Sequence, residues 1–102
     1  MISIYSIFAA VSEVSGIPVD AIRGQRRTRG VVMARFAVVY LIRDLFPLWG
    51  YADIASAIDR ADHGTAAHAL RRSRQLMRDD TDFHNLIVTV LHSIQTPPPP
   101  SS

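Results

Sequence analysis

The side chains best suited to chemistry gather between residues 62 and 78. The stretch opens with an acid of the kind that caps a helix N-terminus, and small or polar residues follow it. Arginines then come in close succession at positions 71, 72, 74 and 78. On a helix, this order would bring polar groups near base edges and guanidinium groups near phosphates. The candidate DNA-contacting residues here are Asp62, His63, Gly64, Thr65, His68 and Arg71.

A helix through this stretch would have two unlike sides. At about 100° per residue, its small and apolar side holds Ala66, Ala69, Leu70, Ser73, Leu76 and Met77. The opposite side holds Gly64, His68, Arg71, Gln75 and Arg78, and it is flanked at the helix start by His63 and Thr65. After a short helix and a tight turn, such a helix is typical of a helix-turn-helix, whose second helix enters the major groove. An ordinary surface helix with solvated arginines would give the same pattern, so the helix alone leaves both interpretations open.

A second basic group lies upstream, in the sequence Gln-Arg-Arg-Thr-Arg-Gly at residues 25–30. Arginines on a loop can reach phosphates, and one of them can enter the minor groove of A·T-rich DNA. The candidates are Arg26, Arg27 and Arg29, although a solvated charge run would look the same. Arg35 lies a little further on and could point out towards a phosphate. It could equally pair with Asp44 or Asp53 inside the molecule.

The composition argues against several other classes of site. There is no cysteine and no lysine, which excludes thiolate metal sites, a P-loop lysine and Schiff-base chemistry. His63 and His68 would point about 140° apart on a helix, unlike the i, i+4 histidine pair of a zinc site. The nine acids are scattered or suited to capping, and no glycine-rich phosphate loop is present. We expect no metal, no nucleotide or other cofactor, and no enzyme activity.

Length and charge set broad limits. With 102 residues the chain is one small domain, expected over residues 1–95 and followed by a flexible Pro/Ser-rich tail at 96–102. The net charge of +2 does not by itself indicate a nucleic-acid partner, so the position of the arginines matters more. No signal peptide is recognisable, and the longest apolar segment is too short to span a bilayer. We expect a cytoplasmic protein with no membrane partner.

Hydrophobic spacing predicts six helices and no strand, hence an all-α fold. The first runs from Ile4 to a stop at Gly16, and a short second covers residues 19–22. A nearly all-apolar helix over residues 31–46 is expected to form the centre of the core. The remaining helices are expected at residues 51–58, from Asp62 to about residue 78, and at residues 83–94.

Taken together, this order of features resembles the C-terminal DNA-binding domain of the bacterial chromosomal replication initiator DnaA. The resemblance covers about residues 4–94 and rests on two motifs. The basic loop at residues 25–29 is similar to the family's K-R-R-S-R loop, and Ala34-Arg35-Phe36 falls where the family's long helix opens. The stretch from Ala61 to Ala69, Ala-Asp-His-Gly-Thr-Ala-Ala-His-Ala, is similar to the signature R-D-H-T-T-V-x-H-A.

The resemblance implies a Trp-repressor-like fold that binds a nine-base DnaA box in duplex DNA. Asp62, His63 and Thr65 would lie in the major groove, an arginine from Arg26, Arg27 or Arg29 in the minor groove, and the turn before Tyr51 against phosphate. It further implies a nucleoid-associated role in replication-initiation control or transcription regulation, here as a stand-alone protein without the family's ATPase module.

Two positions depart from the family pattern. Ala61 stands where the signature has arginine, and Gly64 replaces the first threonine, which removes a hydroxyl and a methyl group that could meet a base. The alternative is therefore a protein-interaction module that keeps the fold but has lost base-specific reading. Such a module could bind a replication initiator or replisome protein through its first helix or its proline tail.

Overall fold

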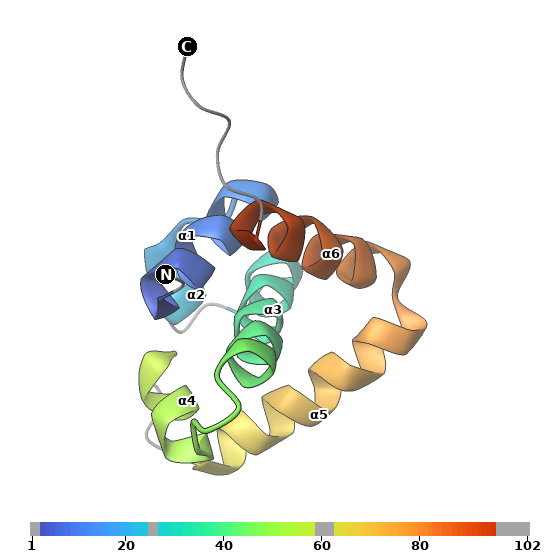
Figure 1. Cartoon of the computed structure of the whole chain (residues 1–102). Coiled ribbons are helices and arrows are strands. Elements are labelled where there is room, and N and C mark those ends of the chain that lie inside the picture. The colour runs from blue at the N-terminus through green and yellow to red at the C-terminus, as the bar shows by residue number, and fades with distance from the viewer. Residues whose placement is uncertain (1–2, 25–26, 59–62, 96–102) are drawn as a thin grey trace.

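The computed structural model describes residues 3–24, 27–58 and 63–95. Within those ranges every regular element is a helix, and there are six of them (Figure 1). The predicted all-α fold is therefore confirmed. The helices are α1 (Ile4–Ser15), α2 (Val19–Arg23), α3 (Arg29–Leu45), α4 (Tyr51–Ala57), α5 (His63–Asp79) and α6 (Thr81–Gln95).

Local signals in the sequence set the ends of α1. The hydroxyl oxygen of Ser3 accepts a 3.2 Å hydrogen bond from the backbone nitrogen of Ser6, which satisfies one of the free donors of the first turn. At the other end, Gly16 adopts a left-handed conformation with φ of 77°, and its N–H donates to the carbonyl of Ser12. Glycine takes this conformation without steric cost. The predicted stop at Gly16 is confirmed.

Two helices begin earlier than the hydrophobic pattern predicts. α3 starts at Arg29 rather than at residue 31, and its first bond runs from the Val32 N–H to the Thr28 carbonyl. α6 starts at Thr81 rather than at residue 83, because the Asp80 carboxylate accepts a 2.9 Å hydrogen bond from the Phe83 N–H and caps it. The first two residues of each of these helices are not apolar, so apolar periodicity alone misses them. The predicted cap Asp62 and the turn at 59–61 lie outside the described residues.

α3 forms the centre of the fold, as its composition predicted. Figure 1 shows it between α1 and α6 on one side and α4 and α5 on the other, and it packs against all five other helices. Its fully buried side chains include Val38, Leu41 and Ile42. They join α1, α4, α5 and α6 in one core through residues such as Ile7, Ile54, Leu70 and Ile87. Burial of this apolar surface supplies the main stabilising free energy of the domain.

α1 and α6 pack side by side and run in opposite directions. Ser15 and Ile17, at the end of α1, line one groove together with Asp82, Phe83 and Leu86 at the start of α6. Among the helices that the structure describes, none is long and apolar enough to cross a membrane. The tail predicted at 96–102 lies outside the described residues.

Candidate nucleic-acid interface

α5 has the two-sided character that the sequence predicts. Its inward side is buried at Ala66, Ala69, Leu70, Ser73 and Leu76, with Met77 half-buried beside them. The only hydroxyl in that set, Ser73, donates a 2.7 Å hydrogen bond to the Leu70 carbonyl and is thereby satisfied. Gly64, His68, Arg71, Gln75 and Arg78 are all exposed on the opposite side, and Thr65 is half-buried at its edge.

The exposed side of α5 is electropositive in its second half. Arg71, Arg72, Arg74 and Arg78 are exposed, and no acid occurs in the helix before Asp79. Small side chains on the inward side, notably Ala66 and Ala69, lie against the core and let α5 approach α3 and α4 closely. The helix is therefore seated firmly by one side while the other presents cations to solvent. Such an arrangement attracts polyanions, and a phosphate backbone is the commonest of these.

The basic loop and α5 meet at one groove of about 380 Å³. Arg27 contributes from the basic loop, Arg29 from the start of α3, and Arg72 from α5. The floor is apolar, and a single acid, Asp80, lies at the rim. The two basic groups that the sequence separates by some forty positions thus form one continuous surface. The floor residues are Val32, Met33, Phe36 and Leu76.

Arg72 is a candidate that the sequence reasoning did not select. Its position on α5 lies about 80° from Gly64 and only about 20° from Thr65 at 3.6 residues per turn. It therefore faces the basic loop rather than the middle of the exposed side. Its guanidinium donates to the Gln75 side chain at 3.3 Å, a contact within α5 that leaves other N–H groups for a ligand. Only the packing of α3 against α5 reveals this placement.

Arg29 is anchored by an acid of the neighbouring helix. Its Nη2 atom lies 3.3 Å from Oδ2 of Asp80, while the other carboxylate oxygen of Asp80 caps α6. The Arg29 side chain is 80% exposed and that of Asp80 is 20% exposed. An exposed pair of this kind contributes at most about 1 kcal/mol to stability. It orients the guanidinium along the groove without removing it from solvent.

Of the alternatives considered for Arg35, the outward orientation towards a phosphate is wrong, because the side chain is buried. It is only 7% exposed, and its guanidinium donates to the carbonyl oxygens of Ile22 at 2.8 Å, Gly24 at 2.9 Å and Ala21 at 3.3 Å. These carbonyls belong to the end of α2, where a helix leaves its last acceptors without intrahelical donors. The suggested partner Asp53 instead accepts a 3.0 Å hydrogen bond from the Gly50 N–H. Arg35 is thus a buried support for the basic loop.

Some predicted contacts fall where the structure gives no description. Arg26 and Asp62 lie outside the described residues, as does the side chain of His63. Of the other candidates, Arg27, Arg29, Gly64, Thr65, His68 and Arg71 lie at the surface formed by α5 and the basic loop, and Arg35 lies beneath it. Across the described ranges, no three histidine or acid side chains gather in a way that could hold a metal ion.

Comparison with known proteins agrees with this arrangement. Residues 4–72, from α1 to the middle of α5, match the family described as the bacterial dnaA protein helix-turn-helix. The chromosomal replication initiator protein DnaA of Mycoplasma capricolum is 27% identical over 96 residues, which cover 94% of this chain and 21% of that protein. The protein of the same name from Herpetosiphon aurantiacus is 32% identical over 84 residues, which cover 82% of this chain and 18% of that protein.

The chain thus spans about a fifth of the length of these two relatives. The match extends through the basic loop and the first ten residues of α5, which are the parts that form the candidate interface. This match agrees with the helix order and with the two-sided character of α5. The chain belongs to the bacterial DnaA helix-turn-helix family.

Proposed function

We propose that this chain binds double-stranded DNA in a sequence-specific manner and acts in the control of replication initiation or of transcription. The first turns of α5 would enter the major groove, where Asp62, His63, Thr65 and His68 would meet base edges. Arg26, Arg27 and Arg29 would contact phosphates, with one of them in the adjacent minor groove. The observation that carries the proposal is the groove in which Arg27 and Arg29 lie beside Arg72 of α5.

The dimensions of α5 support one duplex contacting both basic groups. Arg72 lies seven residues beyond Thr65, which is about 10 Å along a helix axis. The major groove of B-DNA is about 12 Å wide, so a helix that enters by its N-terminus reaches the bordering phosphates near that point. Arg27 and Arg29 line the same groove of the protein as Arg72. They would therefore contact the same phosphate backbone from its other side. Beyond that backbone lies the minor groove.

Contacts to phosphates and contacts to base edges would have different roles. Contacts from Arg27, Arg29, Arg71 and Arg72 to phosphates would supply affinity and register without sequence information. Contacts from Thr65 and His68 to base edges would supply the sequence preference. Gly64 is exposed on the same side of α5 as His68 and offers no side chain, so the preferred site would be less strictly defined at the base pair that this position faces.

Selection of bound duplexes from a random pool tests the proposal. The wild-type chain should retain duplexes at low salt and enrich one motif of DnaA-box length, whereas Thr65→Ala should retain duplexes with a weaker enrichment. Retention without any enriched motif would limit the function to non-specific binding. Failure to retain any duplex at low salt would overturn the proposal and favour the protein-interaction module described above.

A further inference from the structure

The groove between α3 and α5 has a floor that phosphate contacts do not use. Arginine side chains form most of its rim, and a phosphate oxygen would accept hydrogen bonds from their N–H groups. The floor side chains, in contrast, are apolar: Val32, Met33, Phe36 and Leu76. The first three are half-buried, so part of each still faces solvent. An apolar floor inside a cationic rim suits a ligand that is both acidic and apolar.

The rim arginines already bind oxygen atoms of protein side chains. Nη2 of Arg29 lies 3.3 Å from a carboxylate oxygen of Asp80, and Nη1 of Arg72 donates to the side-chain oxygen of Gln75 at 3.3 Å. A guanidinium has five N–H donors, so each of these arginines can bind a further carboxylate without losing its present contact. Arg27 is exposed at the same groove. Glutamate and aspartate side chains of another protein are therefore suitable ligands for the rim.

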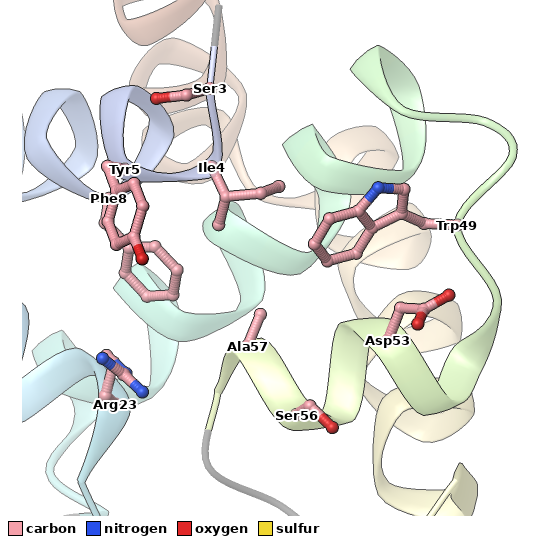
Figure 2. Close-up of a pocket in the computed structure, with 9 residues that line it drawn as sticks. All are labelled: Ser3, Ile4, Tyr5, Phe8, Arg23, Trp49, Asp53, Ser56 and Ala57. Carbon is pink, nitrogen blue, oxygen red and sulfur yellow. The ribbon is translucent and has the colours of Figure 1, made fainter.

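A larger pocket, of about 490 Å³, lies between α1, α2 and α4 and lacks this charge bias. Figure 2 shows its aromatic walls, with Tyr5 and Phe8 on one side and Trp49 on the other. Among the described residues, one cation, Arg23, and one acid, Asp53, line it. The groove between α3 and α5 has three arginines and a single acid, which is already paired. Charge complementarity therefore identifies an acidic occupant for the groove between α3 and α5.

We propose that this groove also docks an acidic amphipathic helix of a partner protein. Glutamates of that helix would bind the rim arginines, while two apolar side chains one turn apart would pack on Met33 and Phe36. The groove volume of about 380 Å³ lies within the range of ligand sites. Apolar residues at i and i+4 share one face of a helix, and helices dock into grooves by such a face.

A partner docked in this way would exclude DNA, because duplex phosphates would need the same three arginines. That exclusion rests on the proposed function, whereas the docking itself does not. The two functions would use the groove differently, since DNA would need only the rim and the partner would need both the rim and the floor. Substitutions in the floor can therefore separate them.

The test uses a fluorescein-labelled synthetic helical peptide with leucine and phenylalanine along one side, glutamate on the other sides, and no tryptophan. Anisotropy measures its binding to the full chain. A control peptide has the same composition, with the apolar residues distributed around the helix. The control should bind at least about tenfold more weakly, because it cannot place two anchors on the floor at once. Equal binding of the two peptides, or no binding of the first at low salt, would overturn the proposal.

A matched pair of substitutions locates the bound peptide. Val32→Thr keeps the shape of the side chain but adds a hydroxyl to the floor, so affinity for the peptide should fall about fivefold while affinity for duplex stays unchanged. Val88→Thr is the control, since Val88 is 49% exposed on α6 and does not line the groove. Circular dichroism checks that both variants are folded. Equal peptide affinities of the two variants would show that the floor is not the docking site and would overturn the proposal.

Trp49 distinguishes this groove from the pocket in Figure 2, because it lines that pocket and is the only tryptophan of the chain. Binding of the unlabelled peptide should leave the emission of Trp49 unchanged. A shift of that emission on binding would place the peptide in the other pocket and overturn the proposal.

Competition with duplex completes the test. Unlabelled duplex should displace the labelled peptide, and a duplex that binds without displacing it would overturn the shared use of the arginines. Peptide binding with the expected effect of Val32→Thr, combined with no binding of duplex alone, would uphold the docking site and contradict the proposed function. Duplex binding without peptide binding would uphold the proposed function and overturn the docking site.

Discussion

The Nε atom of Arg35 lies 2.8 Å from the carbonyl oxygen of Ile22, so the central helix α3 holds the end of α2 by a buried charge. The same guanidinium binds the Gly24 carbonyl, immediately before the basic loop. The far end of that loop is fixed by the first turn of α3, which starts at Arg29. The described residues on either side of 25–26 are thus both fixed, one of them by the buried Arg35 side chain.

Replacing Arg35 should therefore destabilise the domain. Arg35→Met removes the donor for three carbonyls while keeping most of the apolar stem, and we expect the free energy of unfolding to fall by about 3 kcal/mol. Arg35→Lys should lose less, because an ammonium group keeps the charge but cannot reach all three acceptors. Urea titration followed by circular dichroism measures both. An unfolding midpoint of Arg35→Met equal to that of the wild type would contradict the supporting role.

Arg72 should behave as a phosphate contact. Arg72→Ala should weaken binding to all duplexes alike and lower the slope of log affinity against log salt by about 1. Arg74→Ala is the matched control, because Arg74 lies on the same helix but about 160° away at 3.6 residues per turn. It lines a pocket with Tyr40, Arg43 and Asp44, away from the basic loop. Equal effects of the two variants would show that only net charge matters.

Asp80 should oppose DNA binding through its charge and support the fold through its cap. Asn caps helices as well as Asp does, so Asp80→Asn should leave the unfolding midpoint nearly unchanged. It removes the acid from the basic groove and releases Arg29, and affinity for duplex at low salt should rise. Asp80→Ala should show the same gain but lose about 1 kcal/mol of stability with the cap. Fluorescence anisotropy measures the affinity for duplex, and urea titration measures the stability. An unchanged affinity in Asp80→Asn would contradict the prediction that the charge of Asp80 opposes DNA binding.

Thr65 and His68 should govern sequence preference. The wild-type chain is expected to discriminate its selected duplex from a scrambled duplex of equal length. Thr65→Ala and His68→Ala should each lower that ratio by a factor equivalent to about 1–3 kcal/mol while leaving the salt slope unchanged. Competition binding with the two duplexes measures the ratio. If either variant instead lost affinity for both duplexes equally, that residue would not read bases.

The sequence was sufficient to predict the helices because each one carries its own local signal. Apolar spacing located all six, and Gly16 and Asp80 provided stops and caps that act within a few residues. The two-sided pattern of α5 likewise depends only on helical geometry, so Ser73 and His68 fall on the predicted sides. The starts of α3 and α6 were missed because the first two residues of each helix, Arg29-Gly30 and Thr81-Asp82, are not apolar.

The sequence did not predict which residues of different helices lie close together. The sequence left open whether Arg35 points outward or pairs with an acid, because its actual acceptors are backbone carbonyls at positions 21, 22 and 24, which have no side-chain signature. Arg72 looked no different from Arg71 until the packing of α3 against α5 brought it beside Arg27 and Arg29. The pocket lined by Tyr5 and Trp49 joins residues more than forty positions apart, and neither residue indicates it alone.

The most direct test of the account measures how the wild-type chain binds a fluorescent 20-base-pair duplex as salt is varied. The proposed interface places arginines from both the basic loop and α5 on phosphates. Log affinity should therefore fall linearly with log salt, with a slope of about −3 to −4 for four phosphate contacts. Combining Arg27→Ala with Arg72→Ala should reduce that slope by about 2. Absence of binding at low salt, or a slope unaffected by the double variant, would contradict the claim that this surface binds DNA.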